Sequence, residues 1–428
     1  MAGGEIDPQE LDREMIFDPQ DRWYVARMNR ATLAQGEAAG IPPRVIVNDE
    51  TLREGEETPG AYATPADKVR IARALEAAGV PEIVVGFTGT VNGHFELVHI
   101  LREEGIRAHL TARAFALGRG DSWKREVDRV KESGVDRIAF SGFLSECRIA
   151  ATPWLTKAGY PDHIRNIIGY AKSLGMTTAF GLGDAARTQI PVLVNCLAAC
   201  RDAGVDRYYV FDGPGCATPE TMAFLVRLAR DVACDEVAVH CHDDFGLATA
   251  NTIRAVLAGA KVVDVVANGL GDRAGNAALE EVVMALTVLY GVETGIDPAA
   301  LGPLSAVVAE AYNIPVPPGK ALLGDNLYTH ASDSHIAHRL KTGAWYTFEN
   351  IRPEALGGRE IMQFGPAALG RSRDRGAIPV KIEVMGLTCS DATLERIIDR
   401  VSEIVTQRRA ANEAEVEAII REEIGTRA

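Results

Sequence analysis

The chain has 428 residues, of which 47% are hydrophobic, 24% charged and 6% aromatic, and its formal net charge is -14. This composition is typical of a soluble globular protein and leaves room for more than one domain. A net negative charge disfavours nucleic acid as a partner, because phosphate binding requires a basic surface. No apolar run approaches the ~18 residues that a membrane helix requires, so we expect no contact with a membrane.

The seven cysteines are scattered along the chain, and no two form a Cys-x-x-Cys pair. An odd number of dispersed cysteines favours free thiols in a reducing compartment over a disulfide framework. The acidic N-terminal segment lacks the apolar core of a signal peptide. We therefore expect a cytoplasmic protein.

Residues 1–43 are expected to form an N-terminal arm. From about Arg44 onward, short apolar runs alternate with amphipathic stretches. The runs that predict strands are RVIVND, EIVVGF, RAHLTAR, DRIAFSGF, TTAFGLGDA, DRYYVFDG, EVAVHCHDD and VVDVVANGL. The stretches between them, such as PADKVRIARALEAAG, predict helices, and several end in glycine, a common residue at a helix C-terminus.

A strand followed by a helix, repeated over residues 44–291, predicts a (β/α)8 TIM barrel, a fold of the α/β class. No glycine-rich dinucleotide fingerprint follows the first strand, which disfavours an open doubly wound sheet. After about Gly291 the alternation stops. Residues 292–428 are expected to form a linker and a mainly helical C-terminal subdomain, ending in a pair of packed amphipathic helices.

The unusual residues fall where the predicted strands end, which is where TIM-barrel enzymes carry their chemistry. In VHCHDDFGLATAN, His240 and His242 are one residue apart, so they point the same way along a strand. They form half of a divalent-metal site or, alternatively, a buried pair hydrogen-bonded to backbone. Because the eighth strand closes on the first, we expect Glu54 and Asn276 beside them. One carboxylate, two imidazoles and one amide oxygen suit Mn²⁺, Zn²⁺ or Mg²⁺.

Three separated motifs, DETLREGEE, HCHDDFGLATAN and NGLGDRAGNAALEEVVMAL, resemble those of the isopropylmalate, homocitrate and citramalate synthase family. The resemblance extends over roughly residues 44–380. It implies a metal-dependent barrel that condenses the co-substrate acetyl-CoA with a small-molecule 2-oxo acid. Such an acyltransferase would release CoA and a 2-hydroxy-2-alkyl dicarboxylate.

The resemblance makes four residues ligands of the divalent metal: Glu54, His240, His242 and Asn276. It places Arg53 at the keto oxygen of the substrate. Negative charge develops on that oxygen as the carbon–carbon bond forms, so a guanidinium group there stabilises the transition state. Arg113, which ends the third predicted strand, is either an anchor for a substrate carboxylate or part of a structural ion pair.

The segment THASDSHIAHRL resembles part of the family's post-barrel subdomain. His335 matches a histidine that helps to take a proton from the acetyl methyl group, a task that suits imidazole at neutral pH. A catalytic tyrosine is expected after it. Tyr346 has the usual spacing, whereas Phe348 aligns better with the downstream Glu and Pro. In the family this subdomain reaches into the partner's barrel, which implies a homodimer with shared active sites.

The departures from the family pattern cluster at strand ends. Glu57 stands where the family usually has glutamine, and Val84 and Gly183 stand at or beside positions of glutamate. Gly213 replaces a threonine that grips the oxo-acid carboxylate. We therefore expect a rebuilt substrate pocket, to which Glu57 and Gly213 contribute. The two glycines are expected to enlarge it and to favour a bulkier or differently charged acceptor.

Two other functions remain open from the sequence. The first is a metal-dependent lyase or aldolase of the same superfamily that cleaves a 3-hydroxy acid or its CoA thioester. The altered positions 183 and 213 favour it, whereas His335 favours the synthase. The second is a degenerate barrel retained for binding, against which the intact Arg53, Glu54 and paired histidines argue.

Overall fold

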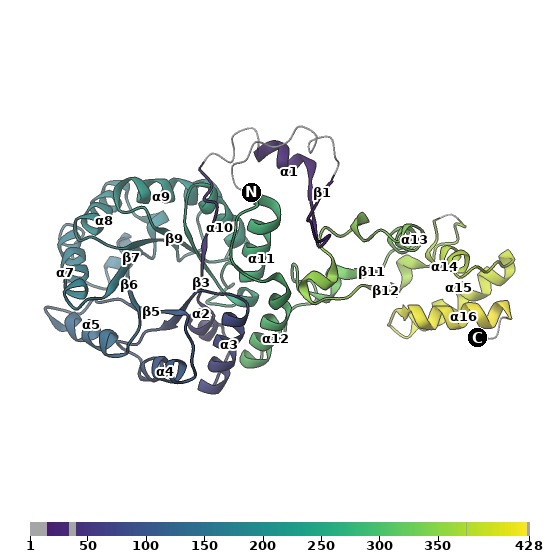
Figure 1. Cartoon of the computed structure of the whole chain (residues 1–428), viewed down its shortest axis with the longest axis horizontal. Coiled ribbons are helices and arrows are strands. Elements are labelled where there is room, and N and C mark those ends of the chain that lie inside the picture. Colours follow the sequence, from purple (N-terminus) through teal and green to yellow (C-terminus); the bar gives the residue numbers. More distant parts are fainter. Residues whose placement is uncertain (1–14, 34–39, 374, 426–428) are drawn as a thin grey trace. The chain divides into compact units, whose positions relative to one another are not determined.

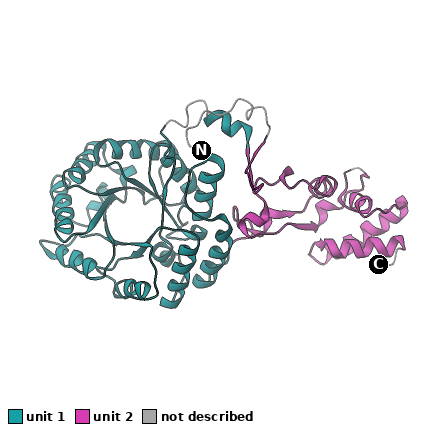
Figure 2. Cartoon of the chain, viewed as in Figure 1, with its two compact units in different colours: residues 1–14, 26–316 teal, residues 15–25, 317–428 magenta. Residues whose placement is uncertain are grey.

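The computed structural model describes residues 15–33, 40–373 and 375–425 (Figure 1). Its two compact units are coloured separately in Figure 2. Within the described residues, the first unit runs from Ala26 to Val316, and the second comprises Met15–Val25 and the chain from Pro317 onward. Of the expected N-terminal arm, residues 1–14 and 34–39 lie outside the described residues, and the described remainder is shared between the two units.

The first unit is a closed barrel of parallel strands, which confirms the predicted TIM barrel (Figure 1). Each strand lies within one of the apolar runs identified above, apart from one residue at the end of the third. The strands are β3 (Ile46–Asp49), β4 (Glu82–Gly86), β5 (His109–Ala114), β6 (Arg137–Gly142), β7 (Thr177–Leu182), β8 (Arg207–Asp212), β9 (Val237–Cys241) and β10 (Val262–Val265). Most of their side chains are buried, as expected for strands covered on both faces.

Amphipathic helices surround the barrel and bury their apolar faces against it (Figure 1). They are α3 (Pro65–Ala77), α4 (Asn92–Glu103), α5 (Ser122–Glu132), α7 (Tyr160–Ser173), α8 (Ile190–Asp202), α9 (Pro219–Val232), α10 (Ala248–Leu257) and α11 (Leu279–Met284). Thr64 and Asp67 form a capping box at the start of α3, where Pro65 occupies the first turn. None of the helices in the described part of the chain is long and apolar enough to cross a membrane.

Closure of the barrel brings the ends of β3, β9 and β10 together. Strand β10 pairs with β3 up to the register Val265↔Asp49, and it pairs with β9 on its other side. The short helix α2 (Thr51–Glu57) begins immediately after β3. The motif that follows β3 therefore lies beside the two histidines that end β9, as the sequence predicts.

The first unit extends beyond the expected barrel limit at residue 291. Helix α12 (Leu301–Tyr312) packs against α3, and the Tyr312 hydroxyl donates a hydrogen bond to the backbone oxygen of Thr51 at 2.8 Å. These contacts place the segment up to Val316 with the barrel, so the compact units divide at Val316/Pro317.

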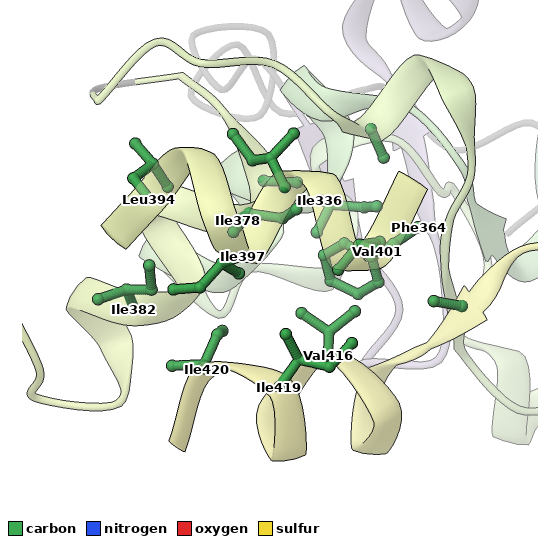
Figure 3. Close-up of a cluster of buried hydrophobic side chains, with 14 residues drawn as sticks. Ile336, Phe364, Ile378, Ile382, Leu394, Ile397, Val401, Val416, Ile419 and Ile420 are labelled. Atoms are coloured by element: carbon green, nitrogen blue, oxygen red, sulfur yellow. The ribbon is translucent and has the colours of Figure 1, made fainter. Parts of the chain in front are cut away.

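The second unit has its own hydrophobic core. Strands β11 (Thr329–His330), β12 (Ile361–Phe364) and β13 (Ala411–Asn412) form a small sheet, and β1 (Met15–Phe17) pairs with β2 (Tyr24–Ala26). The helices are α13 (Asp333–Thr342), α14 (Ala377–Val384), α15 (Asp391–Thr406) and α16 (Glu413–Ile424). Figure 3 shows side chains of α15 and α16, including Ile397 and Ile420, gathered in one buried cluster. The predicted pair of packed amphipathic helices is thus present.

A buried ion network lies at the N-terminal ends of the strands, opposite the predicted site. The Glu82 carboxylate pairs with Arg137 Nη1 at 2.9 Å and with Arg207 Nη1 at 2.5 Å, and all three residues are buried. Arg207 Nε also reaches Glu236 Oε1 at 2.8 Å, but the Glu236 side chain is 37% exposed. Two buried guanidinium groups therefore share one buried carboxylate.

We expect Glu82→Ala to lower the free energy of unfolding by about 3–5 kcal/mol, because it leaves two buried positive charges without their shared partner. Glu236→Ala is the matched control. It removes the exposed partner of the same Arg207 and is expected to cost about 1 kcal/mol or less. Urea denaturation of both variants measures the difference, and equal losses would contradict the assignment.

Candidate metal centre and substrate pocket

Three of the four predicted metal ligands converge at the C-terminal mouth of the barrel. Glu54 Oε1 lies 3.3 Å from His240 Nε2 and 3.9 Å from His242 Nε2. The two Nε2 atoms are 3.3 Å apart, so both imidazoles face the same point, as their spacing on the strand predicts. The three side chains are buried, and their ligand atoms are close enough together to hold one metal ion.

The polar atoms left without partners around this point fit a bound cation. Glu54 Oε2 and Asn276 Oδ1 are buried and have no hydrogen-bond partner within the described residues. The Asn276 backbone bridges to that of His242, which places the fourth predicted ligand at the same site. Buried carboxylate and amide oxygens without partners cost free energy, and coordination of a cation would satisfy them. The donor set of oxygen and imidazole nitrogen suits a divalent ion.

The carboxylates around this point form a negatively charged environment, which favours a positive charge among them. Burial opposes ionisation of Glu54, but the Arg53 guanidinium and His240 together outweigh it and hold the pKa of Glu54 well below its ordinary value. Burial, together with the charge of His240, lowers the pKa of His242 to about 4. The pKa of His240 is raised well above its ordinary value, because the neighbouring carboxylates of Asp264, Glu50 and Glu54 outweigh its burial.

Glu50 links the two predicted arginines. Its Oε2 accepts hydrogen bonds from Arg53, with Nε at 2.8 Å, and its Oε1 pairs with Arg113 Nη2. Arg53 also pairs with Glu54 and, at 3.3 Å, with Glu57. The two arginines thus enter the pocket from β5 and α2 on opposite sides of one buried carboxylate.

Arg113 is part of a structural ion pair and also lines the pocket. Its Nη2 lies 2.7 Å from Asp264 Oδ2, and its guanidinium stacks on Tyr209 and Phe211 at 4.3 and 5.0 Å from the ring centroids. Its Nε and Nη1 atoms are buried without a hydrogen-bond partner in the described chain. The geometry is therefore compatible with both alternatives left open by the sequence.

The pocket above the metal ligands has a volume of about 190 Å³. One side is polar, with Arg53, Glu54, Glu57 and the two histidines. The other side is aromatic and is formed by Phe87, Phe115 and Phe143, which follow β4, β5 and the end of β6. Arg148, Asp272 and Arg273 complete the charged residues of the lining.

The expectation that the two glycines enlarge the pocket is wrong. A Cβ added at Gly183 would lie 2.5 Å from Phe143 Cε1, so the Phe143 ring already fills the space of a side chain at that position. A Cβ added at Gly213 would lie 2.3 Å from the backbone oxygen of Gly183. The Gly213 oxygen itself accepts a hydrogen bond from Arg273 Nη2 at 2.6 Å. The two glycines therefore leave no open space at these positions.

Several pocket residues were missed from the sequence, although a signal for them is present. Phenylalanine follows the glycine or alanine at the end of three successive predicted strands, in VVGF, ARAF and FSGF. Since these strands are neighbours in the barrel, such a repeat places three rings side by side. Glu50 lies within the motif DETLREGEE, directly after the first strand, and could have been found by the same attention to strand ends.

The C-terminal histidine segment lies in the second unit. His335 is on α13, and its ring stacks on Phe348 with centroids 3.7 Å apart and an interplanar angle of 14°. Tyr346 instead packs against Phe17 and Trp345, at 5.2 and 5.8 Å. Of the two residues that the sequence left open, Phe348 is the one stacked on His335. Within the described residues, no ring contact joins Tyr346 to His335.

A barrel with a buried carboxylate and two imidazoles at its C-terminal mouth defines a TIM-barrel enzyme with a candidate metal centre. Residues 44–308 match the family described as HMGL-like. A homocitrate synthase from Methanopyrus kandleri is 35% identical over 388 residues, which cover 90% of this chain and 94% of that protein. An (R)-citramalate synthase from Methanocaldococcus jannaschii is 35% identical over 381 residues, which cover 89% of this chain and 75% of that protein.

The chain belongs to the HMGL-like family, in the enzyme group of homocitrate, citramalate and isopropylmalate synthases. The resemblance inferred from the three motifs is confirmed. Among solved structures, a hydroxymethylglutaryl-CoA lyase from Pseudomonas aeruginosa superposes with a TM-score of 0.54 at 21% identity, covering 63% of this chain and 94% of that one. This likeness shows a shared fold.

His330, near His335, provides a test of the second unit. Its Nε2 lies 2.9 Å from Glu349 Oε1 and 3.1 Å from Glu360 Oε1, and these two carboxylates raise the pKa of His330 to about 9. The pKa of an unfolded histidine is about 6.5. Protonated His330 therefore stabilises the fold fully below about pH 6.5, and this contribution is lost as the pH rises through about 9.

We expect His330→Gln to destabilise the second unit by about 1–3 kcal/mol at pH 6 and by much less at pH 10. Denaturation midpoints of wild type and variant across this range measure the effect. A difference between the two proteins that does not change with pH would contradict the ion-pair assignment.

Proposed function

We propose that this enzyme condenses acetyl-CoA with a 2-oxo acid and releases CoA, with Glu54, His240, His242 and Asn276 as ligands of a divalent metal. The observation that carries the proposal is the convergence of Glu54, His240 and His242 beside Arg53 in one pocket. Kinship with the homocitrate and citramalate synthases supports the same reaction class.

The atoms of the reaction balance as follows. A base removes one proton from the acetyl methyl group, and the resulting enolate carbon attacks the oxo carbon of the acceptor, forming one carbon–carbon bond. The former oxo oxygen becomes an alkoxide and takes up a proton. Water then cleaves the thioester, giving free CoA thiol and a second carboxylate on the 2-hydroxy acid.

A divalent cation held by these four residues would polarise the oxo group of the acceptor and bind its carboxylate. The chain's own contribution at that oxygen is Arg53. Its guanidinium is fixed by Glu50, Glu54 and Glu57 and lines the pocket, so it is positioned for the oxygen on which charge develops. Arg113, with two unpartnered nitrogen atoms, is positioned for the acceptor carboxylate.

The base is assigned to His335, and we infer that it acts across a homodimer, in which the C-terminal unit of one subunit completes the active site of its partner. Imidazole suits this proton transfer at neutral pH. The ring stacked on His335 is that of Phe348, so a hydroxyl group at this place would have to come from another residue. Tyr346 stays a prediction from spacing alone.

Removal of a metal ligand and removal of Arg53 should have different consequences. We expect His242→Ala to lose bound metal and activity together. We expect Arg53→Ala to retain metal while kcat falls about 10²–10³-fold, because it removes a charge-stabilising donor. Metal content by elemental analysis, with turnover measured in parallel, separates the two. Arg70→Ala, which breaks a solvent-exposed ion pair of α3, is the control and should change neither.

The reaction class is tested by CoA-thiol release from acetyl-CoA with metal-replete enzyme and a panel of 2-oxo acids. We expect release with one acceptor and its abolition by a chelator. If no 2-oxo acid of the panel causes CoA release, and the enzyme instead cleaves a 3-hydroxy acid or its CoA thioester, the lyase alternative would replace the synthase.

Shared active sites predict complementation between inactive variants. Arg53→Ala and His335→Ala proteins should each be nearly inactive alone. After mixing and subunit exchange, a heterodimer would carry one site with both residues intact, so activity should reappear. If the mixture stays inactive although exchange is verified by mass, the two residues act within one subunit or His335 is not the base.

A further inference from the structure

Resting on the proposed function, we propose that the acceptor is a 2-oxo acid whose side chain ends in an aromatic ring, an arylpyruvate, and that the ring packs on Phe87, Phe115 and Phe143. The enzyme would then form a 2-hydroxy-2-arylmethyl dicarboxylate. The bonds made and broken are those of the condensation described above, and the aryl group takes no part in them.

The three rings form a continuous wall. Phe87 and Phe115 are stacked, with centroids 5.1 Å apart and planes at 17°, and the Phe115 and Phe143 centroids are 5.8 Å apart. None of these three side chains is buried, and Phe115 is 37% exposed. All three line the pocket of the metal ligands. Aromatic side chains left open in a pocket form a surface for an apolar, flat ligand group.

The chain segments that carry the rings are fixed. The Phe87 N–H donates to His94 Nδ1 at 3.0 Å, and His94 is held in turn by Glu56 at 2.8 Å. The Phe115 N–H donates to Glu126 Oε1 at 3.0 Å. His94, Glu56 and Glu126 thus hold the backbone of the wall and do not line the pocket themselves. A wall fixed in this way loses little conformational entropy when a ligand binds.

The wall lies within reach of the reacting end of the pocket. The Arg53 guanidinium, which pairs with the metal ligand Glu54, lies 5.9 Å from the Phe87 ring centroid. An acceptor whose oxo group lies at Arg53 therefore has an aromatic surface next to its side chain. A methyl group, as in pyruvate, would leave most of this surface uncovered, whereas a phenyl ring attached through one methylene group would cover it.

Phe143 and the neighbouring Arg148 favour different side chains on the acceptor. The Phe143 ring occupies the space that a side chain at Gly183 would require, so the pocket presents an aromatic surface at this position. The Arg148 guanidinium lies 3.7 Å from the Phe143 ring centroid, and no carboxylate pairs with it in the described parts of the chain. The Arg148 guanidinium could instead bind an acceptor that carries a second anionic group. The experiments below therefore compare an aromatic acceptor with an anionic one.

The first experiment measures acceptor preference of the full-length, metal-replete enzyme. CoA release is compared for phenylpyruvate, pyruvate, 2-oxoisovalerate and 2-oxoglutarate, and calorimetry without acetyl-CoA measures binding of the same four acids. We expect phenylpyruvate to have the highest kcat/KM and the lowest Kd, by about tenfold over pyruvate, as burial of a phenyl group implies. Preference for 2-oxoglutarate in both measurements would overturn the proposal in favour of an anionic side chain held by Arg148.

The second experiment tests the wall itself. Phe143→Ala and the milder Phe143→Leu should lower the phenylpyruvate-to-pyruvate ratio of kcat/KM, the former about tenfold. Phe224→Ala is the matched control, because Phe224 lies on α9 and is 44% exposed but does not line the pocket. It should leave the ratio unchanged. An unchanged ratio in both Phe143 variants would contradict the role of the wall.

Failure of the proposal and failure of the proposed function are distinguishable. If CoA is released only with a small or anionic acceptor, the condensation stands and the aromatic acceptor is wrong. If no acceptor releases CoA, the condensation fails, while the calorimetric order of affinities still decides whether the pocket prefers an aromatic ring.

Discussion

The buried carboxylate of Glu50 is the contact on which the arrangement of the site depends. It accepts hydrogen bonds from Arg53, which follows β3, and pairs with Arg113, which comes from β5. Without it, two guanidinium groups would face each other in a buried space and repel. With it, Arg53 stays beside Glu54, and Arg113 keeps two buried nitrogen atoms without a hydrogen-bond partner in the described chain. One carboxylate therefore orients the residues proposed to contact the keto oxygen and the carboxylate of the acceptor.

The pocket combines two surfaces that make opposite demands. The charged side requires ionised groups held in fixed positions, which burial makes costly unless every charge has a partner. The aromatic side requires exclusion of water, and its rings carry no net charge, although the Arg148 guanidinium lies against Phe143. They coexist because the metal-ligand side chains come from α2, directly after β3, and from the end of β9, whereas the rings follow β4, β5 and β6; of the charged groups, Arg113 on β5 and Arg148 after β6 lie on the same side as the rings. The same separation allows the acceptor side to diverge while the reacting side is retained.

The barrel and its metal-binding group could be predicted from the sequence because both depend on local pattern and on closure. Strand period two places His240 and His242 on one side, and an eight-stranded barrel brings the first strand next to the eighth, so Glu54 follows. The glycines could not be interpreted in the same way. Whether a missing side chain leaves a cavity depends on the positions of its neighbours, and the ring that fills the space beside Gly183 comes from residue 143, which follows another strand. The assignment of α12 to the barrel unit likewise depends on a long-range contact, the Tyr312 hydroxyl bonded to Thr51.

The competition between Phe143 and a side chain at position 183 has an evolutionary consequence. Since both cannot occupy the same space, a change from glycine to a larger residue at 183 is obstructed while the phenylalanine is present. A larger residue at 183 therefore requires the Phe143 ring to move away or to be replaced by a smaller side chain. The two positions are thus coupled: whether a larger residue at 183 stabilises or destabilises the protein depends on which residue stands at 143.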